Sequence, residues 1–298
     1  MKGKYLVKGA ITELIATFAD DESLDLGMYR NEVKFQINAG IKGLFVNGLS
    51  GETLYMTREE KKDVTKVAVE EANGKVPVIG NIAEIRPKDA LSLLRDYEEL
   101  GVDAICITQP TTLGYSQEYL VKYYLDLANA TELPVIVYNA PQTNNTLTVT
   151  SVGKIVNGSN NVMGYKDSTQ DIIHLQCVMD EIKDGKHFEC FAGSDATIYP
   201  TLAVGGYGII SLISAVFPKP IIEVCDLYFT GDIKGALKKQ EEILRIRTAL
   251  KGGPFLAGYK YAASLIGLPM GTLRGPLSDA SDAEKEKIKK NLQKLNLL

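Results

Sequence analysis

Three features of the sequence predict a (β/α)₈ TIM barrel with a C-terminal helical extension. The chain has 298 residues, the usual length of one such barrel with a short extension. Short β-rich runs alternate with longer charged amphipathic stretches from residue 11 onward, as in repeated β-α units. No linker rich in proline, glycine or serine divides the sequence. We therefore expect a catalytic barrel over residues 1–220 and a packed helical extension over residues 221–298.

The composition is that of an ordinary globular protein. Hydrophobic residues make up 45% of the chain and charged residues 23%, which suits a large buried core. The net charge of -4 leaves no basic surplus for a phosphate backbone, so nucleic acid is not an expected partner. No apolar stretch is long enough to span a membrane, and residues 1–9 carry charges where a secretory signal is apolar. We expect a cytoplasmic protein.

Cysteine and histidine usage favours neither disulfides nor a metal. The four cysteines lie far apart in apolar runs and are expected to be buried free thiols: Cys106, Cys177, Cys190 and Cys225. Only His174 and His187 are available for a histidine-rich metal site, so we expect no metal.

Eight runs are predicted to be strands, several of them continuously apolar as in parallel sheets buried on both faces. They are residues 11–17, 43–47, 76–80, 104–108, 135–138, 162–166, 188–192 and 208–211. Helix starts follow most of them, as at Thr57 and Ser116, where a hydroxyl precedes acids in the first turn. Beyond the barrel, residues 218–250, 254–266 and 281–295 are predicted to be helical.

In a parallel barrel the active site lies at the C-terminal ends of the strands. The predicted ends are Thr17, Asn47, Asn81, Thr108, Tyr138, Lys166, Gly193 and Ser211. Of these, only Tyr138 and Lys166 are ionisable, so they are the candidate catalytic residues.

Lys166 ends an apolar strand, where a low dielectric should disfavour its charged form and lower its pKa. A neutral amine adds to a ketone to give an imine, which withdraws electrons from the adjacent carbon. A lysine that reaches solvent or pairs with Asp167 is the alternative. Tyr138 ends the neighbouring strand and could move a proton to or from the substrate, the alternative being a core tyrosine.

The loop GLSGE at residues 48–52 follows the second strand. Its glycines let backbone amides approach an anion, and Ser50 adds a hydroxyl donor, which suits a carboxylate. A generic β-α turn is the alternative interpretation.

Together these segments resemble the dihydrodipicolinate synthase and N-acetylneuraminate lyase family of pyruvate-dependent class I aldolases. GLSGE is similar to the family's GxTGE loop, YNAP at residues 138–141 to its YNxP, and GYKD at residues 164–167 to its GxK strand end. Residues 191–195 (FAGSD) and 205–211 (GGYGIIS) resemble its last two strand-end motifs. The order and spacing of these motifs across most of the chain make the resemblance specific.

The resemblance implies a Schiff base on Lys166, a proton relay through Tyr138, and a substrate carboxylate held by Ser50 and the amides of Leu49 and Ser50. Further substrate contacts are expected from Ser168, Gly193, Asp195 and Ile210. The implied partners are pyruvate and an aldehyde, with no metal or organic cofactor. A homotetramer built as a dimer of dimers is also implied.

Departures from the family pattern bear on the second substrate. Thr143 stands where dihydrodipicolinate synthases carry an arginine that anchors an acidic aldehyde. Residues 110–113 (PTTL) lack the tyrosine of the family's intersubunit relay, for which Tyr115 is a candidate substitute. Ala196 replaces the glutamate of sialic-acid lyases. Ser168 and Asp195 could instead bind sugar hydroxyls, with helix capping as their alternative.

We therefore predict a lyase that forms or cleaves a 2-oxo-3-deoxy sugar acid or an N-acetylneuraminate-like compound. The alternative is a dihydrodipicolinate synthase that condenses pyruvate with aspartate semialdehyde. A third possibility is an inactive barrel that binds or senses 2-oxo acids.

Overall fold

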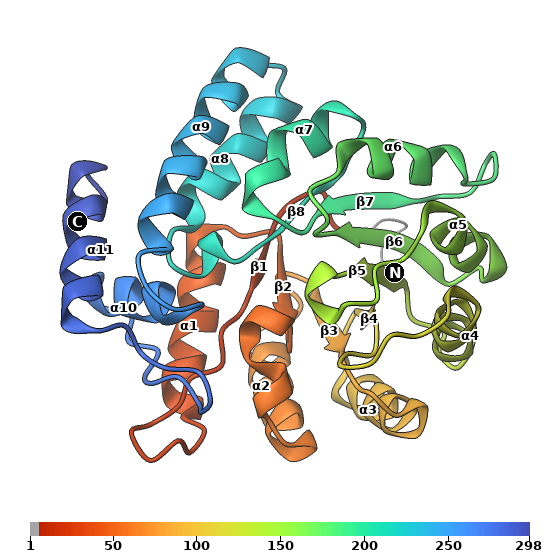
Figure 1. Cartoon of the computed structure of the whole chain (residues 1–298), viewed down its shortest axis with the longest axis horizontal. Coiled ribbons are helices and arrows are strands. Elements are labelled where there is room, and N and C mark those ends of the chain that lie inside the picture. Colours follow the sequence, from red (N-terminus) through yellow and green to blue (C-terminus); the bar gives the residue numbers. More distant parts are fainter. Residues whose placement is uncertain (1–5) are drawn as a thin grey trace.

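The computed structural model describes residues 6–298, over which eight parallel strands close into a barrel (Figure 1). Residues 1–5, which belong to the predicted barrel domain and to the charged segment 1–9, lie outside this range. Each strand pairs with the next, and the last pairs with the first. The strands are β1 (Gly9–Glu13), β2 (Gly43–Val46), β3 (Val78–Ile82), β4 (Ala104–Thr108), β5 (Val135–Asn139), β6 (Val162–Asp167), β7 (Glu189–Ala192) and β8 (Gly208–Ser211). The predicted fold is confirmed.

A helix follows each strand and covers the outside of the barrel (Figure 1). These helices are α1 (Leu26–Ala39), α2 (Arg58–Ala72), α3 (Pro87–Leu100), α4 (Gln117–Ala128), α5 (Val149–Gly158), α6 (Ile172–Asp180), α7 (Ile198–Ala203) and α8 (Pro218–Phe229). The predicted caps are present: Thr57 forms a capping box with Glu60, and the Ser116 side chain accepts from the Tyr119 amide.

Two apolar clusters build the core, one on each face of the barrel wall. Side chains such as Ile11, Phe45 and Ile136 fill the barrel interior. Alternate strand residues point outward and pack against the helices in a second, larger cluster. Because both faces are covered, the strands are almost completely buried, which explains their continuously apolar sequences.

The predicted end of the first strand is wrong. Residues 11–17 were expected to be β, but β1 ends at Glu13. The reason is a hydrogen bond: the Ile15 amide donates to the Glu32 carboxylate on α1 (3.1 Å) rather than continuing the ladder. The third strand is displaced too, since β3 covers Val78–Ile82 rather than residues 76–80.

The C-terminal extension consists of α9 (Ile233–Leu250), α10 (Ala257–Leu265) and α11 (Asp282–Lys294), which lie together on one side of the barrel (Figure 1). The single helix predicted over residues 218–250 is two helices, α8 and α9. Gly231 breaks the chain with a φ of 91°, and the Asp232 side chain caps α9. The predicted boundary at residue 220 lies within α8, and the division into domains stays a prediction.

Three of the four cysteines are buried free thiols as predicted, but Cys177 is exposed on α6, where it lies on the solvent side of the helix. Among the helices of residues 6–298, none combines the length and apolar character needed to cross a membrane.

The Glu32 carboxyl makes stability depend on pH. Burial raises its pKa to about 8, and its Oε2 atom has no hydrogen-bond partner among the described residues. The folded state therefore holds this proton more tightly than the unfolded chain, so the free energy of unfolding should fall as pH rises from the usual carboxyl range through about 8.

Glu32→Gln should remove this dependence, because glutamine keeps an acceptor for Ile15 and cannot ionise. Urea unfolding of both proteins at about pH 5 and about pH 9 checks this. We expect the variant to gain on the order of 3 kcal/mol relative to wild type at the higher pH. If the free energy of unfolding changes equally with pH in the two proteins, Glu32 is not the source of the pH dependence.

Candidate active site

Lys166 and Tyr138 lie side by side at the C-terminal end of the barrel, as predicted. They are register partners on β6 and β5. Lys166 is completely buried and Tyr138 is 3% exposed. The Lys166 Nζ atom lies 4.1 Å from the centre of the Tyr138 ring and 4.2 Å from that of Phe45. The amine therefore projects into the barrel interior between two aromatic faces.

A third ionisable group, Glu13, meets this lysine. Its Oε2 atom lies 2.9 Å from Lys166 Nζ, and both side chains are buried. Its Oε1 atom accepts from the Ser50 amide at 2.8 Å. Gly48 leaves space for the Glu13 carboxylate, since a Cβ atom at position 48 would lie 2.2 Å from Glu13 Oε1. Glu13 ends β1, so the prediction that only Tyr138 and Lys166 are ionisable at the strand ends is wrong.

Glu13 also reverses the expected charge state of Lys166. Burial is the largest single influence and lowers the pKa of this amine, but the Glu13 carboxylate, together with the Tyr138 and Cys106 side chains, raises the pKa above the usual lysine value. The two aromatic rings stabilise the cation further. In the free protein Lys166 is an ammonium, and the predicted decrease in its pKa is wrong. Both alternatives for Lys166 are also wrong, because it neither reaches solvent nor pairs with Asp167.

The Ser168 side chain contacts both Tyr138 and Gly193, the residue that follows β7. Its hydroxyl donates to the Gly193 carbonyl (2.9 Å) and lies 3.2 Å from the Tyr138 oxygen. Gly193 is required here, because a Cβ atom would lie 2.2 Å from Ser168 Oγ. Burial raises the pKa of Tyr138, which therefore keeps its proton at neutral pH. A neutral phenol can donate a proton to a substrate oxygen.

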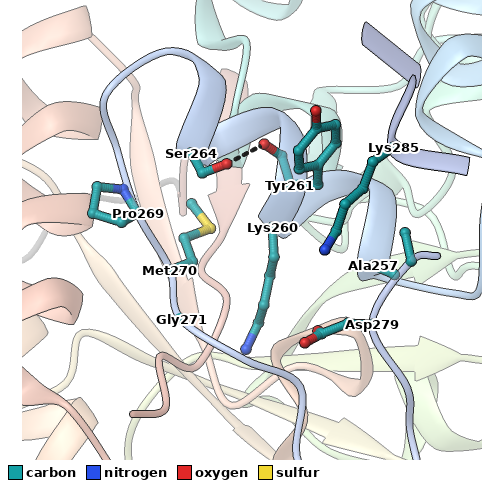
Figure 2. A pocket seen from close by; sticks show the side chains of 10 residues that line it. Ala257, Lys260, Tyr261, Ser264, Pro269, Met270, Gly271, Asp279 and Lys285 are labelled. Carbon is teal, nitrogen blue, oxygen red and sulfur yellow. Dashed lines mark hydrogen bonds between the residues drawn. The ribbon is translucent and has the colours of Figure 1, made fainter. Parts of the chain in front are cut away.

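The loop that was predicted to bind a carboxylate is held by the C-terminal extension. Leu49 and Ser50 form a short 3₁₀ turn, and Leu49 packs on the barrel interior. Glu52 follows with a φ of 59° and pairs with Lys260 Nζ on α10 (2.7 Å). Figure 2 shows Lys260 reaching from α10 past Met270. The Arg274 amide also donates to Glu52. The extension therefore anchors this loop at Glu52, two residues after Ser50.

The side chains of Asp195 and Ile210 are buried and packed against the protein. The Asp195 carboxylate accepts from the Ser211 hydroxyl and from the Ile213 amide (3.3 Å), the first residue of the 3₁₀ turn after β8. The helix-capping alternative for Asp195 is not observed, because Ser194 is the N-cap of the 3₁₀ turn that begins at Asp195. Ile210 packs in the barrel interior with Tyr138. Their predicted substrate contacts stay predictions.

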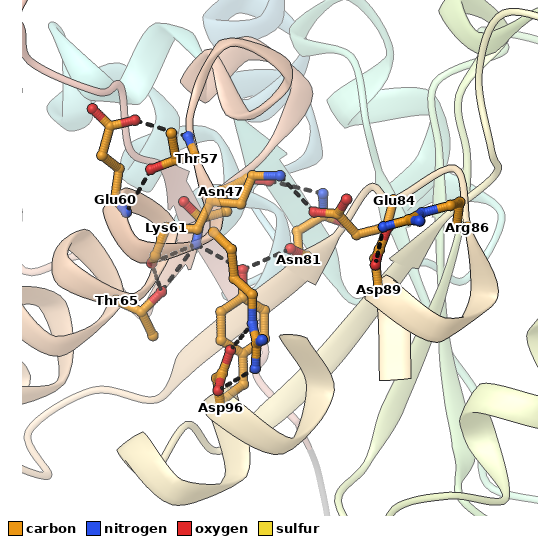
Figure 3. Close-up of polar contacts among 12 residues, drawn as sticks. Asn47, Thr57, Glu60, Lys61, Thr65, Asn81, Glu84, Arg86, Asp89 and Asp96 are labelled. Atoms are coloured by element: carbon orange, nitrogen blue, oxygen red, sulfur yellow. Dashed lines mark hydrogen bonds and ion pairs between the residues drawn. The ribbon is translucent and has the colours of Figure 1, made fainter. Parts of the chain in front are cut away.

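Polar residues at the ends of β2, β3 and β4 hold the barrel rim together. The Asn47 amide group donates to the Tyr97 hydroxyl (2.7 Å) and to Thr65 (2.9 Å), and Asn81 donates to the Asn47 carbonyl (Figure 3). Thr108 in turn donates to the Asn81 side chain (2.8 Å). The side chains at these three strand ends are therefore hydrogen-bonded to their neighbours in the protein.

A pocket of about 220 Å³ opens beside Ser50 at the mouth of the barrel. Leu49, Leu54 and Phe255 form much of its wall, and none of the described residues that line it carries a positive charge. Its polar side chains are Ser50, Tyr55, Thr111, Gln142 and Thr143. The Thr143 hydroxyl donates to the Ala140 carbonyl (2.8 Å) and shapes the turn after β5.

Comparison with known proteins agrees with this architecture. The family model described as the dihydrodipicolinate synthetase family matches residues 6–295. A 4-hydroxy-tetrahydrodipicolinate synthase from Methanopyrus kandleri is 31% identical over 99% of this chain and 98% of its own length. The crystal structure of a dihydrodipicolinate synthase from Thermotoga maritima superposes with a TM-score of 0.93 at 28% identity, covering 99% of this chain and all of that one.

Another solved structure is YagE from E. coli K12, a prophage protein of the dihydrodipicolinic acid synthase family in complex with pyruvate. It has a TM-score of 0.93 at 27% identity and covers 99% of this chain and 100% of its own. The match in sequence and structure spans the barrel and the extension alike. This chain belongs to the dihydrodipicolinate synthetase family, as its motifs predicted, and is a lyase of the class I aldolase type.

Proposed function

We propose that this enzyme forms a Schiff base between Lys166 and the ketone of pyruvate and then makes or breaks a carbon–carbon bond to an aldehyde. The observation that carries the proposal is the place of Lys166 Nζ, buried at the C-terminal end of the barrel beside the Tyr138 ring and the Ser50 loop. The protonated imine withdraws electrons from the adjacent carbon, so no metal or organic cofactor is needed.

The other residues of the site would orient and protonate the substrate. The amides of Leu49 and Ser50, with the Ser50 hydroxyl, bind the pyruvate carboxylate. Tyr138 gives a proton to the substrate oxygen and takes it back, with Ser168 holding its hydroxyl.

Borohydride trapping tests the proposal directly. Incubation with pyruvate and borohydride should add the reduced three-carbon unit to Lys166, as read by peptide mass spectrometry. The absence of an adduct with any 2-oxo acid would favour an inactive binding or regulatory barrel instead.

For the aldehyde, we propose a neutral polyhydroxy compound, so that the reaction makes or cleaves a 2-oxo-3-deoxy sugar acid or an N-acetylneuraminate-like compound. The pocket beside Ser50 offers hydroxyl and amide groups and no cation among its described residues. The names of several relatives favour the rival, a dihydrodipicolinate synthase acting on aspartate semialdehyde. Thr143 at the position of the expected arginine argues against this rival.

Aspartate semialdehyde should accordingly be a poor substrate. Without an arginine that forms two hydrogen bonds with its carboxylate, this aldehyde loses roughly 1.5–3 kcal/mol of transition-state binding. The loss corresponds to about one to two decades in kcat/KM relative to a competing aldehyde. The measurement is kcat/KM for condensation of pyruvate with aspartate semialdehyde and with glyceraldehyde under the same conditions. A preference of about tenfold or more for aspartate semialdehyde would replace the sugar-acid proposal with its rival.

We also propose a homotetramer, built as a dimer of dimers. Leu113 is 67% exposed, Ile85 48% and Tyr119 37%, a set of large apolar side chains around the start of α3 and α4 that a partner subunit would cover. Tyr115 stacks on Tyr119 with ring centres 5.2 Å apart. Sedimentation of wild type and Leu113→Glu tests this, and an unchanged mass would exclude this face as an interface.

A further inference from the structure

We propose that Glu13 takes the proton from Lys166 when a substrate carboxylate enters, and that it returns this proton to the hydroxyl that leaves as the imine forms. The proposal rests on the Schiff-base function proposed above and adds a catalytic residue to it. Neither the motifs nor the family resemblance assigned any role to Glu13.

Glu13 touches the reacting atom and the substrate-binding loop at the same time. One carboxylate oxygen lies 2.9 Å from Lys166 Nζ, and the other accepts from the Ser50 amide at 2.8 Å. The Ser50 amide is the donor that the proposed function gives to the substrate carboxylate. In the free enzyme the Ser50 amide is therefore hydrogen-bonded to Glu13. This hydrogen bond must break before the amide can donate to the substrate carboxylate.

The charges of the site explain why the proton moves. In the free enzyme one carboxylate balances one ammonium, both buried. The other titratable groups near the pair are Cys106 of β4 and Tyr138 of β5, and burial raises the pKa of each, so both are neutral. A substrate carboxylate at Ser50 brings a second anion beside Glu13. Repulsion between the two anions favours transfer of the ammonium proton to Glu13, because like charges in one buried site cannot both stay ionised at low cost.

Imine formation consumes the ion pair and then regenerates it. The ammonium and the carboxylate become an amine and a carboxylic acid, and the amine nitrogen bonds to the ketone carbon. The nitrogen's proton passes to the former ketone oxygen, which becomes a hydroxyl. Glu13 then donates its proton to this hydroxyl, the C–O bond breaks, and water leaves. The products are a protonated imine and an ionised Glu13, which again form an ion pair.

The first test is the rate at which pyruvate becomes trappable by borohydride on Lys166. In Glu13→Gln, which keeps the shape of the side chain but cannot carry the proton, we expect this rate to fall about tenfold or more. In Glu13→Ala, added formate should restore part of the rate by entering the vacated space. Glu32→Gln makes the same change at another buried glutamate on α1 and should stay near wild type. A Glu13→Gln rate equal to or above that of wild type would overturn the proposal.

A second measurement does not depend on pyruvate. Cyanate carbamylates only the unprotonated amine, so the rate of Lys166 carbamylation reports its proton. We expect faster carbamylation at neutral pH in Glu13→Gln than in wild type, the opposite direction to imine formation. Equal rates would show that Glu13 does not control this proton and would overturn the proposal. If the carbamylation rates differ as expected but wild type forms no pyruvate adduct, the proposed function fails and the control of Lys166 by Glu13 stands.

Discussion

Replacing Lys166 with alanine should abolish both turnover and the borohydride-trapped adduct, because no other group can then form the covalent imine. Lys166→Arg should be inactive as well, since a guanidinium stays protonated and cannot add to a ketone. The measurements are steady-state kcat with pyruvate and an aldehyde, and the mass of the reduced protein. Appreciable turnover by either variant would remove Lys166 from the mechanism.

The buried ion pair complicates the alanine variant. Removing Lys166 leaves the Glu13 carboxylate buried without its partner, a change that typically costs about 3–5 kcal/mol. Inactivity could then reflect unfolding rather than lost chemistry. The double variant Lys166→Met with Glu13→Gln removes both charges and keeps much of the volume, so it should stay folded and inactive. Far-ultraviolet circular dichroism and urea unfolding of both variants separate the two causes.

Much of the fold and the centre of the site could be predicted because their signals are local. Runs of apolar residues between capped helices indicate buried parallel strands, and the fold places every strand end at one face. Lys166 and Tyr138 follow from that rule alone, since each stands at the end of a strand. Their pairing across β5 and β6 required only the strand order.

Glu13 was missed because the end of β1 depends on a contact between distant parts of the chain. Leu14 and Ile15 continue the apolar run, so the sequence offers no reason to end the strand before them. The strand ends where Glu32 of α1 takes the Ile15 amide, a contact that only the packed helix reveals. With the strand extended to residue 17, Glu13 falls inside it rather than at the mouth.

The protonation state of Lys166 could not be predicted for the same reason. Burial argues for a neutral amine, and the sequence shows the burial but not the partner, which lies 153 residues away in the chain. The sign of the pKa change depends on the balance between burial and all the nearby groups, and that balance requires their distances from Lys166. A lysine at the end of a strand thus indicates Schiff-base chemistry. It does not indicate whether the amine is charged in the free protein.

Replacing Tyr138 with phenylalanine should lower kcat by roughly 10²-fold or more, with a smaller effect on substrate binding. The phenol is the proton donor proposed for the substrate oxygen; its ring centre lies 4.1 Å from Lys166 Nζ, and the Ser168 hydroxyl contacts its oxygen. The ring should keep its packing against Lys166, because phenylalanine has the same aromatic face. Steady-state kcat and KM for the wild type and the variant measure the effect.

Tyr124→Phe is the matched control for this change. Tyr124 is also buried, and its hydroxyl donates to the Tyr138 carbonyl (2.7 Å) on the outer side of β5. Its loss removes one buried hydrogen bond, which should cost about 1 kcal/mol of stability and leave kcat nearly unchanged. Comparing the two variants separates a phenol that moves protons from one that only supports the strand. If Tyr138→Phe turns over within a few fold of wild type, Tyr138 is a packing residue, and Glu13 or a water molecule must carry the proton that the proposed mechanism gives to the phenol.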